Sequence, residues 1–163
     1  MAANESMFTS DNEDWGTPAC VLERVLRIDR IALDPCHGPA GKVQADTYYS
    51  QAEDGLSLPW RGGQGLVYMN PPYGRGIGDW VDKSIDEYTM GAEVVALVPA
   101  RVETRWFYKY WAFAAAVCFW KGRLKFLGAS DNSAPFPSAV VYLGDRVKRF
   151  DTAFRDAGIV LRL

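Results

Sequence analysis

The sequence predicts an α/β fold, a three-layer sandwich in which helices cover both faces of a mostly parallel sheet. Short apolar runs of strand length alternate along the chain with segments whose apolar residues recur at helical spacing. One run, residues 94–98, is continuously apolar, which is typical of a parallel strand buried on both faces. With 163 residues, 48% of them hydrophobic, the chain can bury one core, so we expect residues 15–163 to form a single domain.

The N-terminal part begins with residues 1–14, which are polar and aperiodic, and we expect them to form a mobile tail. Thr17-Pro18 is typical of a helix start, with a hydroxyl N-cap followed by proline at the first helical position. A short strand over residues 31–33 then ends at Asp34, and residues 40–64 are rich in loop residues. The helix that begins at Thr17-Pro18 and precedes this strand has one apolar face, made of Val21, Leu22, Val25 and Leu26.

The central strand is expected over residues 65–69, and it stops at Asn70-Pro71-Pro72-Tyr73. The two prolines cannot continue the strand, because neither can donate a hydrogen bond to a sheet ladder. The strand would therefore deliver Asn70 to the carboxyl edge of the sheet, where α/β folds bind their ligands. The stiff Pro-Pro pair then fixes an amide, two carbonyl groups and an aromatic ring at one place, so this stretch predicts a site.

The second half of the chain continues the same alternation. Helices are expected over residues 77–89, after the cap residue Thr104, and at the apolar series Val147, Phe150, Phe154 and Ala157. Further strands are expected at residues 94–98, 117–120, 124–126 and Ser138–Leu143, and Gly158 leads into a last apolar run at 159–161. The pattern shows neither an internal repeat nor a second domain that could recognise a target.

The net charge is −2, but the charges are unevenly distributed. Residues 1–54 hold ten acids and four bases, a charge of −6, whereas the remainder holds ten acids and fourteen bases, a charge of +4. The densest basic stretch, residues 101–125, contains six bases against the single acid Glu103. An acidic part and a basic part suit a protein whose polyanionic partner meets one face only.

Composition excludes several other classes of protein. No apolar run approaches the ~20 residues needed to cross a bilayer, and the first residues lack the pattern of a signal peptide. Cys20, Cys36 and Cys118 lie far apart and His37 is the single histidine, so neither a disulfide framework nor a metal site is indicated. We expect a protein of the reducing cytoplasm that uses no membrane and no metal.

Polar residues stand where the expected strands end or the helices begin. Three such segments are Thr17-Pro18, Asp34-Pro35-Cys36 and Asn70-Pro71-Pro72-Tyr73, and Asp54 is a fourth candidate. Each of them alone is also typical of an ordinary helix cap, turn or rigid connection. Their order and spacing together favour a functional interpretation.

In that order the segments resemble the S-adenosylmethionine-dependent DNA N6-adenine methyltransferases, and most closely the small enzymes that phages encode. The resemblance runs from Trp15 to about Leu143, and Asn70-Pro71-Pro72-Tyr73 matches the catalytic motif of the family. The other segments that carry it are 14–18, 33–36, 53–56 with Trp60, 98–101, 122–126 and 134–139. It implies a Rossmann-like S-adenosylmethionine-dependent methyltransferase fold, reduced in the region of the second and third strands.

The resemblance also implies a phage- or prophage-encoded enzyme that works in the cytoplasm of a bacterial host cell. It further implies which residues form the S-adenosylmethionine site. Thr17 and Pro18 would lie near the methionine moiety, Asp34 near its amino group, and Asp54 at the adenine N6. Asp46 is the candidate for the ribose hydroxyls. The cofactor-binding set carried over is Thr17, Pro18, Asp34, Pro35, Cys36, Asp54 and Asn70.

The catalytic set carried over is Asn70, Pro71, Pro72 and Tyr73. The N6 amine of adenine is a poor nucleophile, because its lone pair is delocalised into the ring. Two acceptors, expected to be the side-chain oxygen of Asn70 and the backbone carbonyl of Pro71, can draw it towards tetrahedral geometry and stabilise the developing charge. Tyr73 would stack on the base, which has to leave the duplex to be reached.

Basic residues downstream of the motif are candidates for DNA contacts. Lys121, Arg123 and Lys125 alternate, so on a strand they would project from one face, and with Arg101 and Arg105 they could neutralise phosphates. A solvated strand edge protected by lysines is the alternative. Arg75 has a stronger claim, because it follows Tyr73-Gly74 directly.

A second aromatic ring is also expected near the base. Phe136, flanked by Pro135 and Pro137, resembles a second stacking position, and Phe126 is a rival for the role. A core position is an equally good interpretation of Phe136. Without a separate recognition domain, specificity would be low or short, or would come from loops near residues 39–64 and 127–137.

The sequence therefore predicts an enzyme that transfers a methyl group from S-adenosylmethionine to adenine N6 in duplex DNA, as a monomer or a small homo-oligomer. One alternative keeps the motif and changes the acceptor, since protein-glutamine N5-methyltransferases also use Asn-Pro-Pro-Tyr. Another alternative is a non-catalytic nucleic-acid-binding module on a methyltransferase fold.

Overall fold

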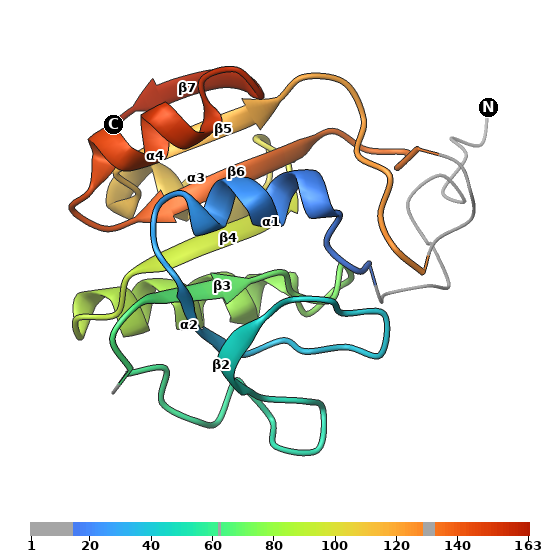
Figure 1. The fold of residues 1–163 in the computed structure, drawn as a ribbon, viewed down its shortest axis with the longest axis vertical. Coiled ribbons are helices and arrows are strands. Elements are labelled where there is room, and N and C mark those ends of the chain that lie inside the picture. The colour runs from blue at the N-terminus through green and yellow to red at the C-terminus, as the bar shows by residue number, and fades with distance from the viewer. Residues whose placement is uncertain (1–14, 62, 129–132) are drawn as a thin grey trace.

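The computed structural model describes residues 15–61, 63–128 and 133–163, so the predicted tail at residues 1–14 lies outside the described part. Seven strands form one sheet in the order β2-β1-β3-β4-β6-β5-β7 (Figure 1). The strands are β1 (Ile31–Asp34), β2 (Ala45–Tyr48), β3 (Leu66–Met69), β4 (Val94–Pro99), β5 (Ala116–Trp120), β6 (Ser138–Leu143) and β7 (Gly158–Arg162). The helices are α1 (Ala19–Leu26), α2 (Ile77–Thr89), α3 (Arg105–Phe113) and α4 (Val147–Phe154).

The predicted three layers are confirmed. Helices α1 and α4 bury Val21, Val25, Phe150 and Phe154 against one face of the sheet, in a core that includes Tyr68 of β3. Helices α2 and α3 bury their apolar residues against the other face, in a second core that includes Met69. Adjacent residues of β3 thus point to opposite faces, as a strand buried on both sides requires. None of the helices in the described ranges is long and apolar enough to span a membrane.

The expectation of a mostly parallel sheet is wrong for half of it. The pairs β1–β2, β1–β3 and β3–β4 are parallel, whereas β4–β6, β5–β6 and β5–β7 are antiparallel. The reason is that β6 returns between β4 and β5, and β7 adds to the far edge of β5. Strands β1 to β5 still share one direction, so their carboxyl ends meet at a single edge, which we call the carboxyl edge.

Three local expectations differ from the structure. Residues 124–126 form no strand, because β5 already has β6 and β7 on its two sides, and Leu127 pairs instead with Gly16 in an isolated bridge. Strand β2 lies in the segment expected to be loop, at the edge of the sheet. Thr17 does not cap α1: Pro18 is the N-cap, with no side-chain hydrogen bond, and the Thr17 hydroxyl points elsewhere.

The topology places several loops at the carboxyl edge. Strands β1, β3, β4 and β5 run into residues 35–44, 70–76, 100–104 and 121–128, and β6 starts there, after residues 133–137, because it is antiparallel to β4. In Figure 1 these connections lie together on the side of the sheet where the chain enters α1. At the opposite, amino edge, Arg146 forms ion pairs with Glu93 and Asp29, at 2.6 and 2.7 Å.

Candidate active site

Asn70 leaves the carboxyl end of β3 with its amide in a fixed orientation. Its Nδ2 donates hydrogen bonds to the backbone oxygen of Trp15 at 2.5 Å and to Thr17 Oγ1 at 3.0 Å. Because the Trp15 carbonyl can only accept, the nitrogen must lie on that side of the amide. The oxygen Oδ1 is buried and has no hydrogen-bond partner within the described residues. The side chain therefore presents a free, immobilised acceptor.

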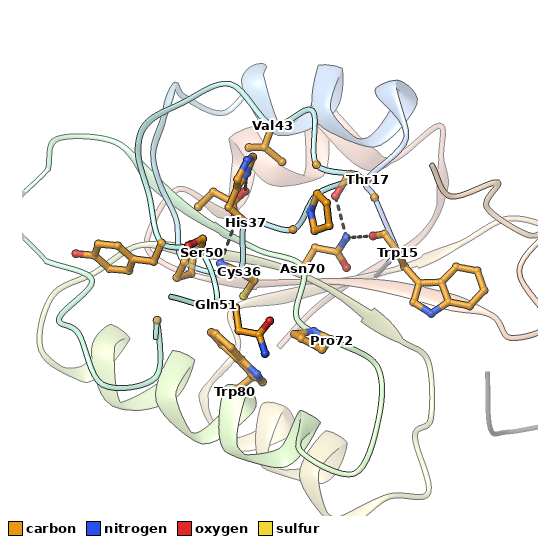
Figure 2. Close-up of a pocket in the computed structure, with 18 of the residues that line it drawn as sticks. Trp15, Thr17, Cys36, His37, Val43, Ser50, Gln51, Asn70, Pro72 and Trp80 are labelled. Atoms are coloured by element: carbon orange, nitrogen blue, oxygen red, sulfur yellow. Dashed lines mark hydrogen bonds and ion pairs between the residues drawn. The ribbon is translucent and has the colours of Figure 1, made fainter. Parts of the chain in front are cut away.

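The hydroxyl of Thr17 helps to fix this orientation of the Asn70 amide. Its hydroxyl is 2.9 Å from the hydroxyl of Tyr68, which lies on β3 and is fully buried. Thr17 itself is 1% exposed, so its hydroxyl needs these two partners. The start of α1, the middle of the sheet and the Asn70 loop are thus joined by one short hydrogen-bonded chain. Figure 2 shows the part of it that joins Thr17 to Asn70.

A cleft of about 900 Å³ opens beside Asn70. Figure 2 shows His37 and Val43 on one side of it, and Gln51 and Trp80 on the other. Six of the seven residues expected to bind a cofactor line this cleft: Thr17, Asp34, Pro35, Cys36, Asp54 and Asn70. Pro18 is the exception; it is buried at the start of α1 and does not line the cleft. A volume of this size suits a ligand as large as a nucleoside with a side chain.

Asp34 brings a buried carboxylate to the cleft, at the end of β1. It is 3% exposed, and its oxygens accept from the backbone N–H of Cys36 and lie 3.1 Å from His37 Nδ1. Burial raises the pKa of the Asp34 carboxyl above its ordinary value, although the Cys36 and His37 contacts act in the opposite direction. A cationic ligand group next to Asp34 would relieve that penalty.

Cys36 lies between Asp34 and Asn70. Burial raises the pKa of its thiol well above the ordinary value, and the nearby Asp34 charge acts in the same direction, while the backbone N–H of Asn70 opposes both. A neutral thiol is a weak nucleophile. Cys36 therefore acts as a wall of the cleft and as a contact between the loops after β1 and β3.

Asp54 lines the cleft, but its carboxylate bonds within its own turn. Oδ1 accepts from the backbone N–H of Leu56 at 3.2 Å, and Oδ2 accepts from the hydroxyl of Ser57. Asp54 also has a positive φ of 56°, so the turn is tight. Gly55 follows at a place where a Cβ atom would come within 2.0 Å of the Pro35 oxygen. Only glycine lets the two cofactor-side loops approach so closely.

An aromatic cluster stands on the other side of Asn70. Tyr73 makes edge-on contacts with Phe126 and Phe136, with ring centres 5.9 and 5.4 Å apart, and Trp15 contacts the same two rings at 5.4 Å each. The Tyr73 hydroxyl donates to the Leu97 carbonyl at 3.1 Å, and burial raises its pKa, so the phenol stays neutral. Both Phe126 and Phe136 thus contact the motif ring.

The comparisons with known proteins agree with this geometry. The model of the family described as DNA N-6-adenine-methyltransferase (Dam) matches residues 5–141, well over half of the chain. The chain belongs to the Dam family. This confirms the predicted family and places the chain among enzymes that methylate adenine N6 in DNA. No curated protein matches the chain.

Membership of the Dam family implies a methyl donor and a DNA substrate. The cations expected to meet DNA all lie on segments at the carboxyl edge or just beyond it. Arg75 follows the motif, Arg101 follows β4, and Arg105 opens α3. Lys121, Arg123 and Lys125 are exposed and form no ion pair with another described residue. Arg123 and Lys125 alternate with the buried residues Leu124 and Phe126, although this segment does not belong to the sheet.

Other cleft residues carried no sequence signal of their own. Trp80 fits the apolar stripe of α2, and Gln51 and Ser50 lie in a stretch with only loop composition. Asp46, the candidate for the ribose hydroxyls, is paired with Arg30 and does not line the cleft. Ser50 and Gln51 follow β2 after Tyr49, so the segment after that strand brings a hydroxyl and an amide group to the cleft.

Proposed function

We propose that the protein transfers the methyl group of S-adenosylmethionine to the N6 amine of an adenine turned out of duplex DNA. The observation that carries this proposal is the orientation of Asn70. Its nitrogen is anchored by Trp15 and Thr17, and its oxygen is buried without a partner beside a cleft of about 900 Å³. An immobilised acceptor costs no reorganisation when charge develops on the amine.

The cleft residues fit S-adenosylmethionine. The buried carboxylate of Asp34 would receive the cationic amino group, since a carboxylate can accept more hydrogen bonds than the two partners it has. Gln51 offers its amide to the ribose, whereas the Ser50 hydroxyl already donates to Glu53 and accepts from the Ala52 N–H. Trp80 and Pro35 offer apolar surface for the adenine ring. The close packing of Gly55 on Pro35 holds the two loops that form this wall. When bound, the sulfonium supplies an activated methyl group.

The chain's own residues would prepare the acceptor. The oxygen of Asn70 and the backbone carbonyl of Pro71 would accept the two N–H groups of the amine and increase its nucleophilic character. Tyr73 would offer its ring to the base, with its hydroxyl held by the Leu97 carbonyl. Stacking is worth about 1–3 kcal/mol per base, which offsets much of the cost of turning the base out. The proton can leave to water after transfer.

DNA would lie across the carboxyl edge, whose loops carry Arg75, Arg101, Lys121, Arg123 and Lys125. Contacts of this kind are made to phosphates and are largely independent of sequence. We infer a single domain of the Rossmann-like methyltransferase type with β2 alone beyond β1 in the sheet, and short or low sequence specificity supplied by loops. We infer the cytoplasm of a bacterial host as its place of action, and the free thiols of the three cysteines support a reducing environment.

The test is incubation with labelled S-adenosylmethionine and plasmid DNA, followed by detection of N6-methyladenine. Asn70→Ala is expected to lower the rate about 10²- to 10³-fold, while calorimetry shows cofactor binding within a few-fold of wild type. Gln64→Ala is the matched control, since it removes an exposed carboxamide at the amino end of β3. Label in protein rather than DNA would favour the glutamine methyltransferase, and absence of cofactor binding would favour the binding module.

A further inference from the structure

Unpartnered polar atoms gather at the carboxyl edge. Among the described residues, four buried side-chain polar atoms lack a hydrogen-bond partner: Trp15 Nε1, Asn70 Oδ1, Ser138 Oγ and Glu87 Oε2. Glu87 is ion-paired with Lys83 and Arg61 elsewhere in the fold. The other three belong to the carboxyl edge, and a buried polar group without a hydrogen-bond partner lowers stability. The indole N–H of Trp15 needs an explanation, because the proposed function uses only Asn70.

Trp15 is held in place from three directions. Its backbone oxygen accepts from Asn70 Nδ2 at 2.5 Å. The next residue, Gly16, exchanges two backbone hydrogen bonds with Leu127, at 2.9 and 2.8 Å. The indole is 9% exposed and contacts the rings of Phe126 and Phe136. An N–H group fixed this firmly cannot turn to find an acceptor of its own.

Trp15 is one of the residues that line the cleft, but its indole ring points away from the cofactor side. Figure 2 shows the ring projecting away from the cleft, on the far side of Asn70 from Cys36 and His37. Its two aromatic neighbours, Phe126 and Phe136, are also the neighbours of the motif residue Tyr73. Trp15, whose backbone oxygen holds the Asn70 amide, and Tyr73, three residues after Asn70, therefore belong to the same aromatic cluster.

We propose that Trp15 Nε1 donates a hydrogen bond to a ring nitrogen of the target adenine, N1 or N7, while Asn70 Oδ1 accepts from its amine. This inference rests on the proposed function. In adenine both ring nitrogens that flank the amine are acceptors, so a donor beside an acceptor matches either edge. In guanine and thymine a carbonyl oxygen replaces the amine and would face the Asn70 oxygen. The Trp15–Asn70 pair thus favours a base whose amine lies beside a ring acceptor, as in adenine and cytosine, over guanine and thymine.

The experiment measures kcat/KM on a synthetic duplex whose site is first mapped on plasmid DNA treated with the wild-type protein. The target base is adenine, 1-deazaadenine or 7-deazaadenine, so that one ring nitrogen is removed at a time. Trp15→Phe is expected to lower kcat/KM on adenine about 10- to 100-fold. On the analogue that lacks the contacted nitrogen, Trp15→Phe and wild type are expected to agree within about threefold, because neither can form the bond.

Controls separate the hydrogen bond from packing. Incorporation of 3-benzothienyl-L-alanine at position 15 keeps the ring size and removes only the N–H, so it preserves the fold if the smaller phenylalanine does not. Trp106→Phe, on α3, is the matched variant outside the site and is expected to retain wild-type rates. Comparing the ratio of wild type to variant on each base cancels the effect of the analogue on amine reactivity.

Two results would overturn the inference and leave the proposed function standing. One is an equal loss for the position 15 variants on adenine and on both analogues, which would mark the ring as packing only. The other is wild-type kcat/KM for the benzothienylalanine protein on adenine. A wild-type protein that binds S-adenosylmethionine but methylates no DNA would instead remove the proposed function, and the role of Trp15 with it.

Discussion

The two edges of the sheet differ in whether their polar side chains have hydrogen-bond partners. At the amino edge, Arg146 donates to both oxygens of Glu93 and to Asp29, and Tyr142 donates to Glu93, so every partner is satisfied. At the carboxyl edge, Asn70 and Trp15 leave an acceptor and a donor without partners in the described chain. Unsatisfied buried groups lower stability and are retained where they serve a ligand.

The contrast indicates that the amino edge contributes to stability and the carboxyl edge to function. The amino edge ties the loop before β1 and the start of β4 to the segment that leads into α4, far from the cleft. The carboxyl edge holds Asp34 buried with a raised pKa and Asn70 with a free oxygen. Substitutions at the two edges should therefore separate stability from function, and the following predictions test this.

Asp34→Asn tests the carboxyl edge and carries the largest effect of the three. We expect affinity for S-adenosylmethionine to fall about 10- to 100-fold by calorimetry, because a charged acceptor for the amino group is lost. Since burial raises the Asp34 pKa, the folded state binds the proton more tightly than the unfolded state, and stability falls as pH rises from 3.8 through the raised value. The neutral amide avoids that loss.

The cofactor-free Asp34→Asn protein is accordingly expected to have a Tm equal to or above wild type at pH 7. The difference should narrow as the pH is lowered through the raised value towards 3.8, because Asp34 then takes up its proton first in the folded state and next in the unfolded state. Thermal unfolding monitored by circular dichroism across that pH range measures it. A lower Tm at pH 7 together with unchanged cofactor affinity would contradict the prediction, because Asp34 would then serve stability and not cofactor binding.

Arg146→Ala tests the amino edge. It leaves Glu93 and Asp29 without their shared partner, and we expect a loss of about 2 kcal/mol, or about 4–8 °C in Tm. Methylation by the folded protein at 20 °C should stay within about twofold of wild type, because the site is at the other edge. Arg155→Ala, which removes an exposed pair with Asp151, is the control and should cost less than about 0.5 kcal/mol.

The sequence located the elements that have strong apolar patterns and missed those that do not. The runs at β1, β3, β4, β5 and β6 were recognisable because buried strands are continuously apolar. Strand β2 was missed because three of its four residues are exposed at the sheet edge. Residues 124–126 alternate like a strand because Leu124 and Phe126 are buried, but no neighbouring strand is available to pair with them.

In the site, too, the sequence predicted the positions of residues but not the directions of their side chains. The position of Asn70 at a strand end followed from the Pro-Pro pair, whereas the direction of its amide depends on the Trp15 carbonyl, 55 residues away. Thr17 has the local signature of a helix cap, but its hydroxyl bonds Tyr68 and Asn70 because tertiary partners outcompete the local one. Trp15 gave no hint of an unpartnered N–H, since that depends on everything packed around it.

Lys125→Ala carries the smallest effect and sharpens the contrast for DNA. Lys125 is exposed between buried Leu124 and Phe126 on the segment at the carboxyl edge, so we expect it to contact a phosphate. Its loss should weaken DNA binding about two- to tenfold near 0.1 M salt and lower the slope of log affinity against log salt by about 0.9. Fluorescence anisotropy on a labelled duplex across a salt series measures both quantities.

Lys148→Ala is the matched control, because it removes the same charge from an exposed site at the start of α4, beside the amino edge. If the phosphates lie only along the carboxyl edge, the Lys148 variant keeps the wild-type slope, since it releases no counterion from the DNA. Equal changes in slope for the two variants would mean that DNA responds to the net charge of the protein. The carboxyl edge would then hold the reacting base without defining the path of the duplex.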